Sequence, residues 1–206
     1  MKIYFIQSTP YYGDNKLIKK GRLYFVGLAP AILASLVPDC DFEVCLETIE
    51  DVNFDSDCDI VAISGMGHAI LRSIDIAKEF KKRGKTVVMG GYMVSLMPEE
   101  AKKYCDSVII GDAELSFPQM VKDYKMGCLK EFYNMPLEKL TYPLPKYELL
   151  AQKKIGNFLP VQAGRGCPNS CSFCSVYCLY KNRYLKRDIE EVVRDIKRIK
   201  ELGYNR

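Results

Sequence analysis

The chain has 206 residues, of which 48% are apolar, and this suffices to bury the core of one domain and part of a second. Its 30 basic and 26 acidic residues give a net charge of +4, which is too small to indicate a nucleic-acid partner. No stretch approaches the ~18 consecutive apolar residues of a membrane helix, and the opening MKIYFIQSTP lacks the apolar region of a signal peptide. We therefore expect a cytoplasmic protein without a membrane span that acts on a small molecule.

Short apolar runs alternate with amphipathic segments, a pattern typical of a doubly wound α/β sheet. The clearest helix is predicted over residues 69–83, with Gly84 at its end, and two more begin near Pro98 and Leu115. The spacing suits the flavodoxin-like strand order 2-1-3-4-5, in which ligands bind beyond the carboxyl ends of the strands. Strands are predicted over residues 2–7, 42–46, 60–64, 86–89 and 107–110.

Three loops at the predicted strand ends carry glycine and small polar residues. Glycine lets a backbone approach a bulky ligand or adopt a positive φ, so these loops predict a pocket at one edge of the sheet. Ordinary turn chemistry accounts for the same composition equally well. The candidate pocket residues are Ser8, Thr9, Pro10, Ser64, Met66, Gly67, His68, Gly90, Gly91 and Tyr92.

The stretch from about residue 24 to residue 122 resembles the cobalamin (vitamin B12)-binding domains found ahead of radical S-adenosylmethionine (SAM) barrels. The segments that carry the resemblance are VAISGMGHA, VVMGGYMVSLMPEEA and CDSVIIGDAELSFPQMV. It implies a flavodoxin- or Rossmann-like domain that binds cobalamin. The cobalamin contacts that it implies are Ser64 and Met66 (the Ser-x-Leu element), Gly90 and Gly91 (the glycine pair beside the nucleotide tail), and Gly111, Asp112 and Glu114 (the Gly-Glu-Gly-Glu segment).

One motif of cobalamin proteins is missing. The sequence Asp-x-His-x-x-Gly, whose histidine ligates cobalt in methyltransferases and mutases, is absent after the first predicted strand. Cobalamin bound here would lack that ligand, as it does in many radical enzymes of this type. His68 is the only histidine, and it is either a cobalt ligand or a hydrogen-bonding surface residue, the commoner role of a single loop histidine.

The periodicity fades between residues 126 and 157, where Pro136, Pro143 and Pro145 interrupt a polar segment. We predict a cobalamin-binding-like α/β domain over residues 1–125, a linker over 126–157 and an incomplete barrel over 158–206. The last region begins with a predicted strand over 158–163, followed by GRGCPNSCSFC and a helix that Asp188 and Glu191 are predicted to cap. Strand, loop and helix would form the first βα unit of a TIM-like barrel.

Nine cysteines without a secretion signal favour metal chemistry over disulfides. Cys167, Cys171 and Cys174 form Cys-x3-Cys-x2-Cys, and three such thiolates suit a [4Fe-4S] cluster that keeps one iron without a protein ligand. With its Gly-Arg-Gly-Cys-Pro lead, the segment resembles the radical SAM family. The resemblance implies that the open iron binds S-adenosyl-L-methionine and that a flavodoxin or ferredoxin supplies the electron.

The leading hypothesis is therefore a radical SAM enzyme with a cobalamin-binding domain, which catalyses methyl transfer, cyclisation or rearrangement at an unactivated carbon. Cys178 supports an alternative, a non-catalytic zinc or iron-sulfur module with four cysteine ligands. A complete barrel takes roughly 200 residues, so we expect the chain to be a truncated fragment of the enzyme. A further alternative is that this fragment has no activity by itself. Transfer-RNA methylthiotransferases also join a flavodoxin-like domain to this barrel, but they carry extra cluster cysteines in the first domain. The loop after the first predicted strand of this chain, Ser8-Thr9-Pro10, contains no cysteine.

Overall fold

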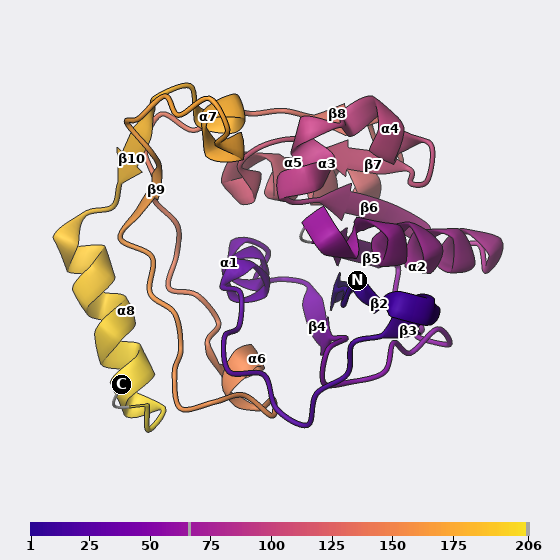
Figure 1. Cartoon of the computed structure of the whole chain (residues 1–206), viewed down its shortest axis with the longest axis horizontal. Coiled ribbons are helices and arrows are strands. Elements are labelled where there is room, and N and C mark those ends of the chain that lie inside the picture. Colours follow the sequence, from indigo (N-terminus) through magenta and orange to yellow (C-terminus); the bar gives the residue numbers. More distant parts are fainter. Residues whose placement is uncertain (66, 205–206) are drawn as a thin grey trace.

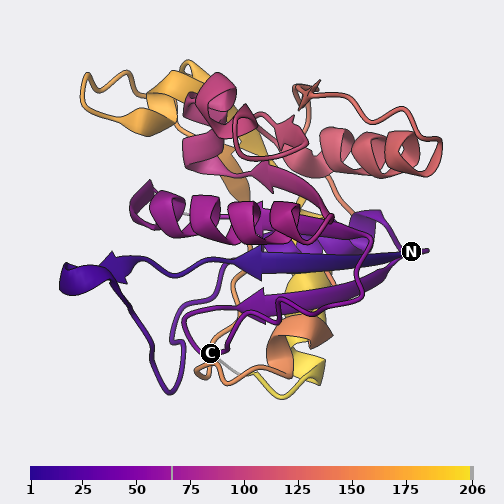
Figure 2. The same ribbon diagram turned by 90° about the vertical axis from the view of Figure 1, so that its right-hand side faces the viewer.

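The chain folds around a six-stranded parallel sheet, and the computed structural model describes residues 1–65 and 67–204. The strand order is β4-β1-β5-β6-β7-β8, and every neighbouring pair runs parallel. Figure 2 shows β1 (indigo) and β4 side by side, pointing the same way. The six strands are β1 (Lys2–Gln7), β4 (Asp41–Leu46), β5 (Ile60–Ser64), β6 (Thr86–Gly90), β7 (Ser107–Ile109) and β8 (Phe132–Tyr133).

The prediction of a doubly wound parallel sheet is confirmed, and the five predicted strands lie in the predicted order. The sheet has a sixth strand, β8, because the segment from residue 126 to residue 157 returns along the edge of β7. That segment also contributes the short helix α6 and the buried side chains of Tyr147, Leu150 and Ile155 to one apolar cluster. β8 is only two residues long, too short for a periodic pattern to reveal.

Helices cover both faces of the sheet because successive strand side chains point to opposite sides. Ile3 and Phe5 of β1 face α1 and α5, whereas Tyr4 and Ile6 face α2, α3 and α4. None of the described helices is both long and apolar enough to cross a membrane. The helices are α1 (Ala29–Leu36), α2 (Ile70–Lys82), α3 (Tyr92–Leu96), α4 (Pro98–Lys102), α5 (Ala113–Lys125), α6 (Glu148–Ala151), α7 (Ser175–Tyr180) and α8 (Ile189–Glu201).

The helices predicted near residues 69, 98 and 115 are present as α2, α4 and α5. Gly84 follows α2 with φ +72°, and its N–H donates to the Lys81 carbonyl, as expected of a helix end. The prediction did not include α1, whose residues are apolar almost all round and therefore show no amphipathic period. Nor did it include α3, which begins at Tyr92 directly after the glycine pair.

The prediction of a strand over residues 158–163 is wrong. The segment is extended but joins no sheet; Pro160 lacks an N–H donor, and Leu159 packs into the apolar cluster beneath α1 and α5 instead. A short antiparallel ribbon follows, in which β9 (Gly164–Gly166) pairs with β10 (Tyr184–Lys186). This ribbon is not the parallel strand that the first unit of a barrel requires. Two further short strands, β2 (Tyr11–Tyr12) and β3 (Lys16–Leu17), form a separate hairpin.

The last helix, α8, spans nearly the predicted residues, and α1 lies between it and the sheet (Figure 1). The predicted capping box is wrong, because Asp188 makes no cap hydrogen bond and pairs with Lys139 at 2.6 Å. The Glu191 carboxylate likewise accepts hydrogen bonds from Thr141 Oγ1 and Arg187 Nε rather than from the backbone N–H of the capping box. Among the apolar residues of α8, Ile199 is buried, whereas Ile189, Val193 and Ile196 are exposed.

Candidate functional site

A cavity of about 230 Å³ lies at the carboxyl ends of β5, β6 and β7, on the face of the sheet that α1 and α5 cover. Apolar side chains from the strands and from these helices form most of its wall. Ligands of doubly wound sheets bind at this edge, in concave and largely apolar sites. The apolar wall includes Phe5, Ile32, Leu33, Ala62, Val88, Ile109 and Phe117.

Predicted residues from three separate segments meet at this cavity. Parallel strands present all their carboxyl ends at one edge, so loops that are distant in the sequence lie together. That these residues contact a cofactor stays a prediction. The predicted residues that line the cavity are Ser64 of β5, Gly90, Gly91 and Tyr92 around the end of β6, and Gly111, Asp112 and Glu114 after β7.

Gly91 is required by the backbone at the end of β6. Its φ is +98°, and a Cβ atom there would lie 2.9 Å from Ser64 Oγ, closer than real Cβ atoms approach. Ser95 Oγ donates to the Gly91 carbonyl and accepts the Gly111 N–H, both at 2.8 Å. The loops after β6 and β7 are thus joined, and this edge of the cavity presents backbone rather than side chains.

Tyr92 lines the cavity, and its hydroxyl group is buried without a hydrogen-bond partner among the described residues. A buried polar group left without a partner costs about 1–3 kcal/mol. The polar groups of the cavity wall include Ser64, Asp112, Glu114 and Arg165.

The predicted residues after β1 do not line the cavity. Ser8 is buried with its Oγ 2.7 Å from Ser73 Oγ, and the Thr9 N–H donates to Glu47 Oε2 at 3.0 Å. These contacts tie the loop after β1 to α2 and to the end of β4. They give Ser8 and Thr9 structural roles that the sequence did not reveal.

Three other predicted residues, Pro10, Gly67 and His68, are also absent from the cavity wall. His68 is exposed, as expected for a surface histidine. Met66 lies outside the described residues.

The cysteine-rich loop connects β9 to α7. Cys167 and Cys174 are half-buried, whereas Cys171 and Cys178 are exposed. Gly166, just before the loop, has φ +89°, and a Cβ there would lie 2.2 Å from the Arg183 carbonyl, so the close approach of β9 and β10 requires glycine. Over residues 1–65 and 67–204, no group of three or more His, Cys, Asp or Glu side chains is gathered closely enough to hold a metal ion.

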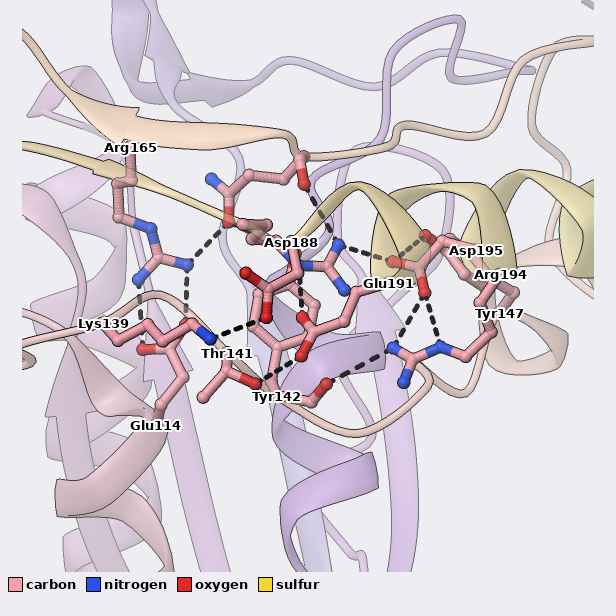
Figure 3. Close-up of polar contacts among 12 residues, drawn as sticks. Glu114, Lys139, Thr141, Tyr142, Tyr147, Arg165, Asp188, Glu191, Arg194 and Asp195 are labelled. Carbon is pink, nitrogen blue, oxygen red and sulfur yellow. Dashed lines mark hydrogen bonds and ion pairs between the residues drawn. The ribbon is translucent and has the colours of Figure 1, made fainter.

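Arg165 is a cavity residue that the sequence analysis did not identify. It lies on β9, two residues before Cys167, and its guanidinium binds both acidic residues after β7, of which Figure 3 shows Glu114. Nη1 lies 2.7 Å from Asp112 Oδ1 and 3.0 Å from Glu114 Oε2, and Nη2 lies 2.7 Å from Glu114 Oε1. The sequence showed an arginine between the two glycines before Cys167, but it did not show its partners, because Asp112 and Glu114 lie more than fifty residues earlier in the chain.

The Tyr180 hydroxyl, at the end of α7, also donates to Asp112 Oδ1 at 2.8 Å. Burial opposes the charge on Arg165, but hydrogen bonds and ion pairs with Glu114 and Asp112 outweigh burial and raise the pKa of the guanidinium. Burial, and then the Asp112 charge, raise the pKa of the Tyr180 hydroxyl. Both groups therefore stay protonated as donors to these carboxylates.

A second polar cluster continues from Arg165 toward α8. Gln162 accepts from Arg165 Nη2 at 2.7 Å through its side chain and from Arg187 Nη1 at 3.0 Å through its carbonyl. Arg187 Nη1 lies 2.7 Å from Asp195 Oδ2, and neither side chain is exposed to solvent. The Arg187 guanidinium also stacks on the Tyr142 ring, 4.0 Å from its centroid. Figure 3 shows this chain of contacts leading from α5 to α8.

The part of the chain that forms most of the cavity wall matches a described protein family. Residues 32–121 match the family described as the B12 binding domain. This range runs from α1 to α5 and includes most of the cavity wall.

The curated relatives include methyltransferases and methylases, and also methylthiotransferases. A bacteriochlorophyllide d C-8(2)-methyltransferase of Chlorobaculum tepidum is 34% identical over 80% of this chain and 40% of that protein. A bacteriochlorophyllide d C-12(1)-methyltransferase of the same organism is 29% identical over 68% of this chain and 32% of that protein. A hopanoid C-3 methylase of Methylococcus capsulatus is 27% identical over 63% of this chain and 30% of that protein. The chain thus spans no more than 40% of the length of these relatives.

Proposed function

Residues 32–121 form a B12-binding domain, and we propose that it binds cobalamin for a methyl transfer that also uses radical SAM chemistry. The observation that carries the proposal is the cavity at the carboxyl ends of β5, β6 and β7. Its wall includes the glycine pair and the Gly-Asp-Ala-Glu segment that resemble the cobalamin-contacting elements of the family.

The residues present suit the nucleotide tail of cobalamin. An aromatic base would find apolar side chains such as Ile32 and Phe117, and Gly91 keeps the wall beside the strand end free of a side chain. When bound, cobalamin supplies a transferable methyl group.

No cobalt ligand is proposed from this chain. His68 is exposed and does not line the cavity, and the motif that supplies a histidine ligand in other cobalamin proteins is absent. The chain would hold the cofactor through its tail.

Methyl transfer is favoured over cyclisation or rearrangement because the named relatives are methyltransferases or methylases. This part of the proposal rests on proteins of which the chain spans no more than 40%. We propose no particular substrate. The electron donor would be a flavodoxin or ferredoxin, as the radical SAM resemblance implies.

The cluster is proposed from the cysteine spacing. Cys167, Cys171 and Cys174 provide three thiols on one short loop, the number of ligands needed for a [4Fe-4S] cluster with one open iron. The thiols are not gathered in the described structure, so they would have to converge on binding, and we derive no catalytic step through the cluster. When present, the cluster and S-adenosyl-L-methionine would supply the radical.

Equilibrium dialysis of the chain against methylcobalamin in the dark tests the first part of the proposal. We expect one cobalamin per chain, bound equally well by the His68→Ala variant. Failure to retain cobalamin would contradict the proposed function, and loss of binding only in His68→Ala would contradict attachment through the tail alone.

Anaerobic reconstitution with iron and sulfide tests the second part. We expect about four irons per chain, lost when Cys167, Cys171 or Cys174 is replaced by serine and retained in Cys178→Ser. Zinc held through all four cysteines, with loss in Cys178→Ser, would favour the alternative of a non-catalytic metal module.

A further inference from the structure

The cysteine loop is attached to the cavity wall on both sides. Arg165 lies on β9 before the loop, and Leu179 and Tyr180 lie on α7 after it; all three residues line the cavity. Every cysteine of the three-cysteine motif falls between these two attachment points. The position of the loop is therefore determined by contacts with the B12-binding domain.

Both attachments end on the same carboxylate. Asp112 Oδ1 accepts from Arg165 Nη1 at 2.7 Å and from the Tyr180 hydroxyl at 2.8 Å. Arg165 adds a two-pronged contact with Glu114, one oxygen to each terminal nitrogen. The side chains are largely shielded, with exposed fractions of 18% for Arg165, 11% for Asp112 and 5% for Glu114. Shielded, charge-assisted bonds of this kind are among the strongest polar contacts in proteins.

Arg165 is hard to replace in this position. A guanidinium neutralises two carboxylates at once, whereas a neutral side chain would leave both charges shielded from solvent without this cation beside them. Asp112 and Glu114 lie at the start of α5 and form part of the cavity wall. A ligand in the cavity would therefore contact the same elements that hold the loop.

We propose that Arg165 is a positioning residue that couples the cavity to the cysteine loop, so that a bound cobalamin tail and an ordered loop stabilise each other. The coupling rests on the proposed cobalamin binding, and it is reciprocal by thermodynamic linkage. A tail in the cavity is enclosed by Leu179 and Tyr180 and adds contacts that hold the loop in place. Release of the loop removes those contacts and weakens cobalamin binding.

Pulsed alkylation with iodoacetamide, read by mass spectrometry on the full chain, measures how freely the loop opens. Cys167 is the reporter, and the exposed Cys128 is the internal reference. Without ligand, we expect alkylation of Cys167 to be about tenfold faster in Arg165→Gln, because buried charged hydrogen bonds are lost. The matched control Arg83→Gln, which removes contacts with Asp55, Glu79 and the Phe54 ring, should leave that rate unchanged.

A second variant guards against general unfolding in Arg165→Gln. Tyr180→Phe removes one hydroxyl and should accelerate alkylation in the same direction by a smaller factor, while Cys128 reacts as in the wild type. Equal Cys167 rates in the wild type, Arg165→Gln and Tyr180→Phe would overturn the proposal.

Methylcobalamin, added in the dark, completes the test. It should slow Cys167 alkylation in the wild type and fail to do so in Arg165→Gln at a concentration where dialysis shows cobalamin bound. Protection that persists in Arg165→Gln, or no protection of a wild type that binds cobalamin, would overturn the coupling. If the wild type binds no cobalamin, the proposed function fails, and the rates without ligand still decide whether Arg165 fixes the loop.

Discussion

The sheet region and the region after residue 157 are held together by different forces. Six parallel strands bury apolar side chains on both faces, and each face is covered by helices. The later region has two strands of three residues each and is joined to the rest by apolar side chains such as Leu159 and Ile199 and by buried charged groups around Arg165 and Arg187. Ion-pair contacts depend on the charge state of both partners and, where they are exposed, on screening by salt. The two regions should therefore respond differently to the same change.

The largest expected effect is in the sheet region. Phe80 of α2 is fully buried between Tyr4 and Phe54, so Phe80→Ala leaves a cavity in the apolar cluster. We expect a loss of about 4 kcal/mol in the free energy of unfolding. Urea denaturation followed by circular dichroism measures it. A loss below about 1 kcal/mol would show that apolar packing does not dominate this region.

Asp195→Ala should loosen the later region without unfolding the sheet. The substitution removes the nearer of two carboxylates from the fully buried Arg187 guanidinium and leaves it with Glu191, at a cost of about 3 kcal/mol. Hydrogen exchange should accelerate along α8 while β5 keeps its protection. Equal acceleration in both elements would mean that the two regions unfold as one unit, and an unchanged α8 would mean that the ion pair does not hold it.

Alkaline pH should act on the sheet region through its buried thiols. Burial raises the pKa of the Cys105 thiol from 9.0 to about 11, so the native state keeps a proton that the unfolded chain loses. The resulting stabilisation is complete below about pH 9 and is lost as the pH rises to about 11. Cys105→Ala should make this alkaline loss about 2 kcal/mol smaller, because one pKa unit corresponds to about 1.4 kcal/mol. Identical pH profiles for both proteins would refute a buried neutral thiol.

The smallest expected effect lies at the edge of α8. Lys139 and Asp188 form an ion pair at 2.6 Å, but their side chains are 59% and 51% exposed. Lys139→Gln should therefore change the free energy of unfolding by no more than about 0.5 kcal/mol. A loss as large as that of Asp195→Ala would contradict the distinction between buried and exposed ion pairs.

The sheet could be predicted from the sequence because its parallel strands, such as β1 and β5, are buried on both faces. Such strands are short continuous runs of apolar residues, which the sequence shows directly. The position of Gly90 and Gly91 at the cavity followed from the predicted strand ends, which meet at one edge in any parallel sheet, whereas Gly111, Asp112 and Glu114 became candidates only through the family resemblance. The prediction of a strand over residues 158–163 was wrong because a strand requires a neighbouring strand to pair with. An apolar run in the sequence shows that a segment is buried but does not show whether such a partner exists. Arg165 was missed because its partners, Asp112 and Glu114, become neighbours only through the tertiary fold.

The most direct test of cobalamin binding in this cavity is the affinity for methylcobalamin of Gly91→Val beside that of Gly13→Val. A side chain at Gly91 would collide with Ser64 at the cavity wall, whereas a Cβ at Gly13 meets nothing within 4 Å. With both variants folded by circular dichroism, equilibrium dialysis should show wild-type affinity for Gly13→Val and an affinity at least about tenfold weaker for Gly91→Val. Wild-type affinity in Gly91→Val would show that the cofactor does not occupy this cavity.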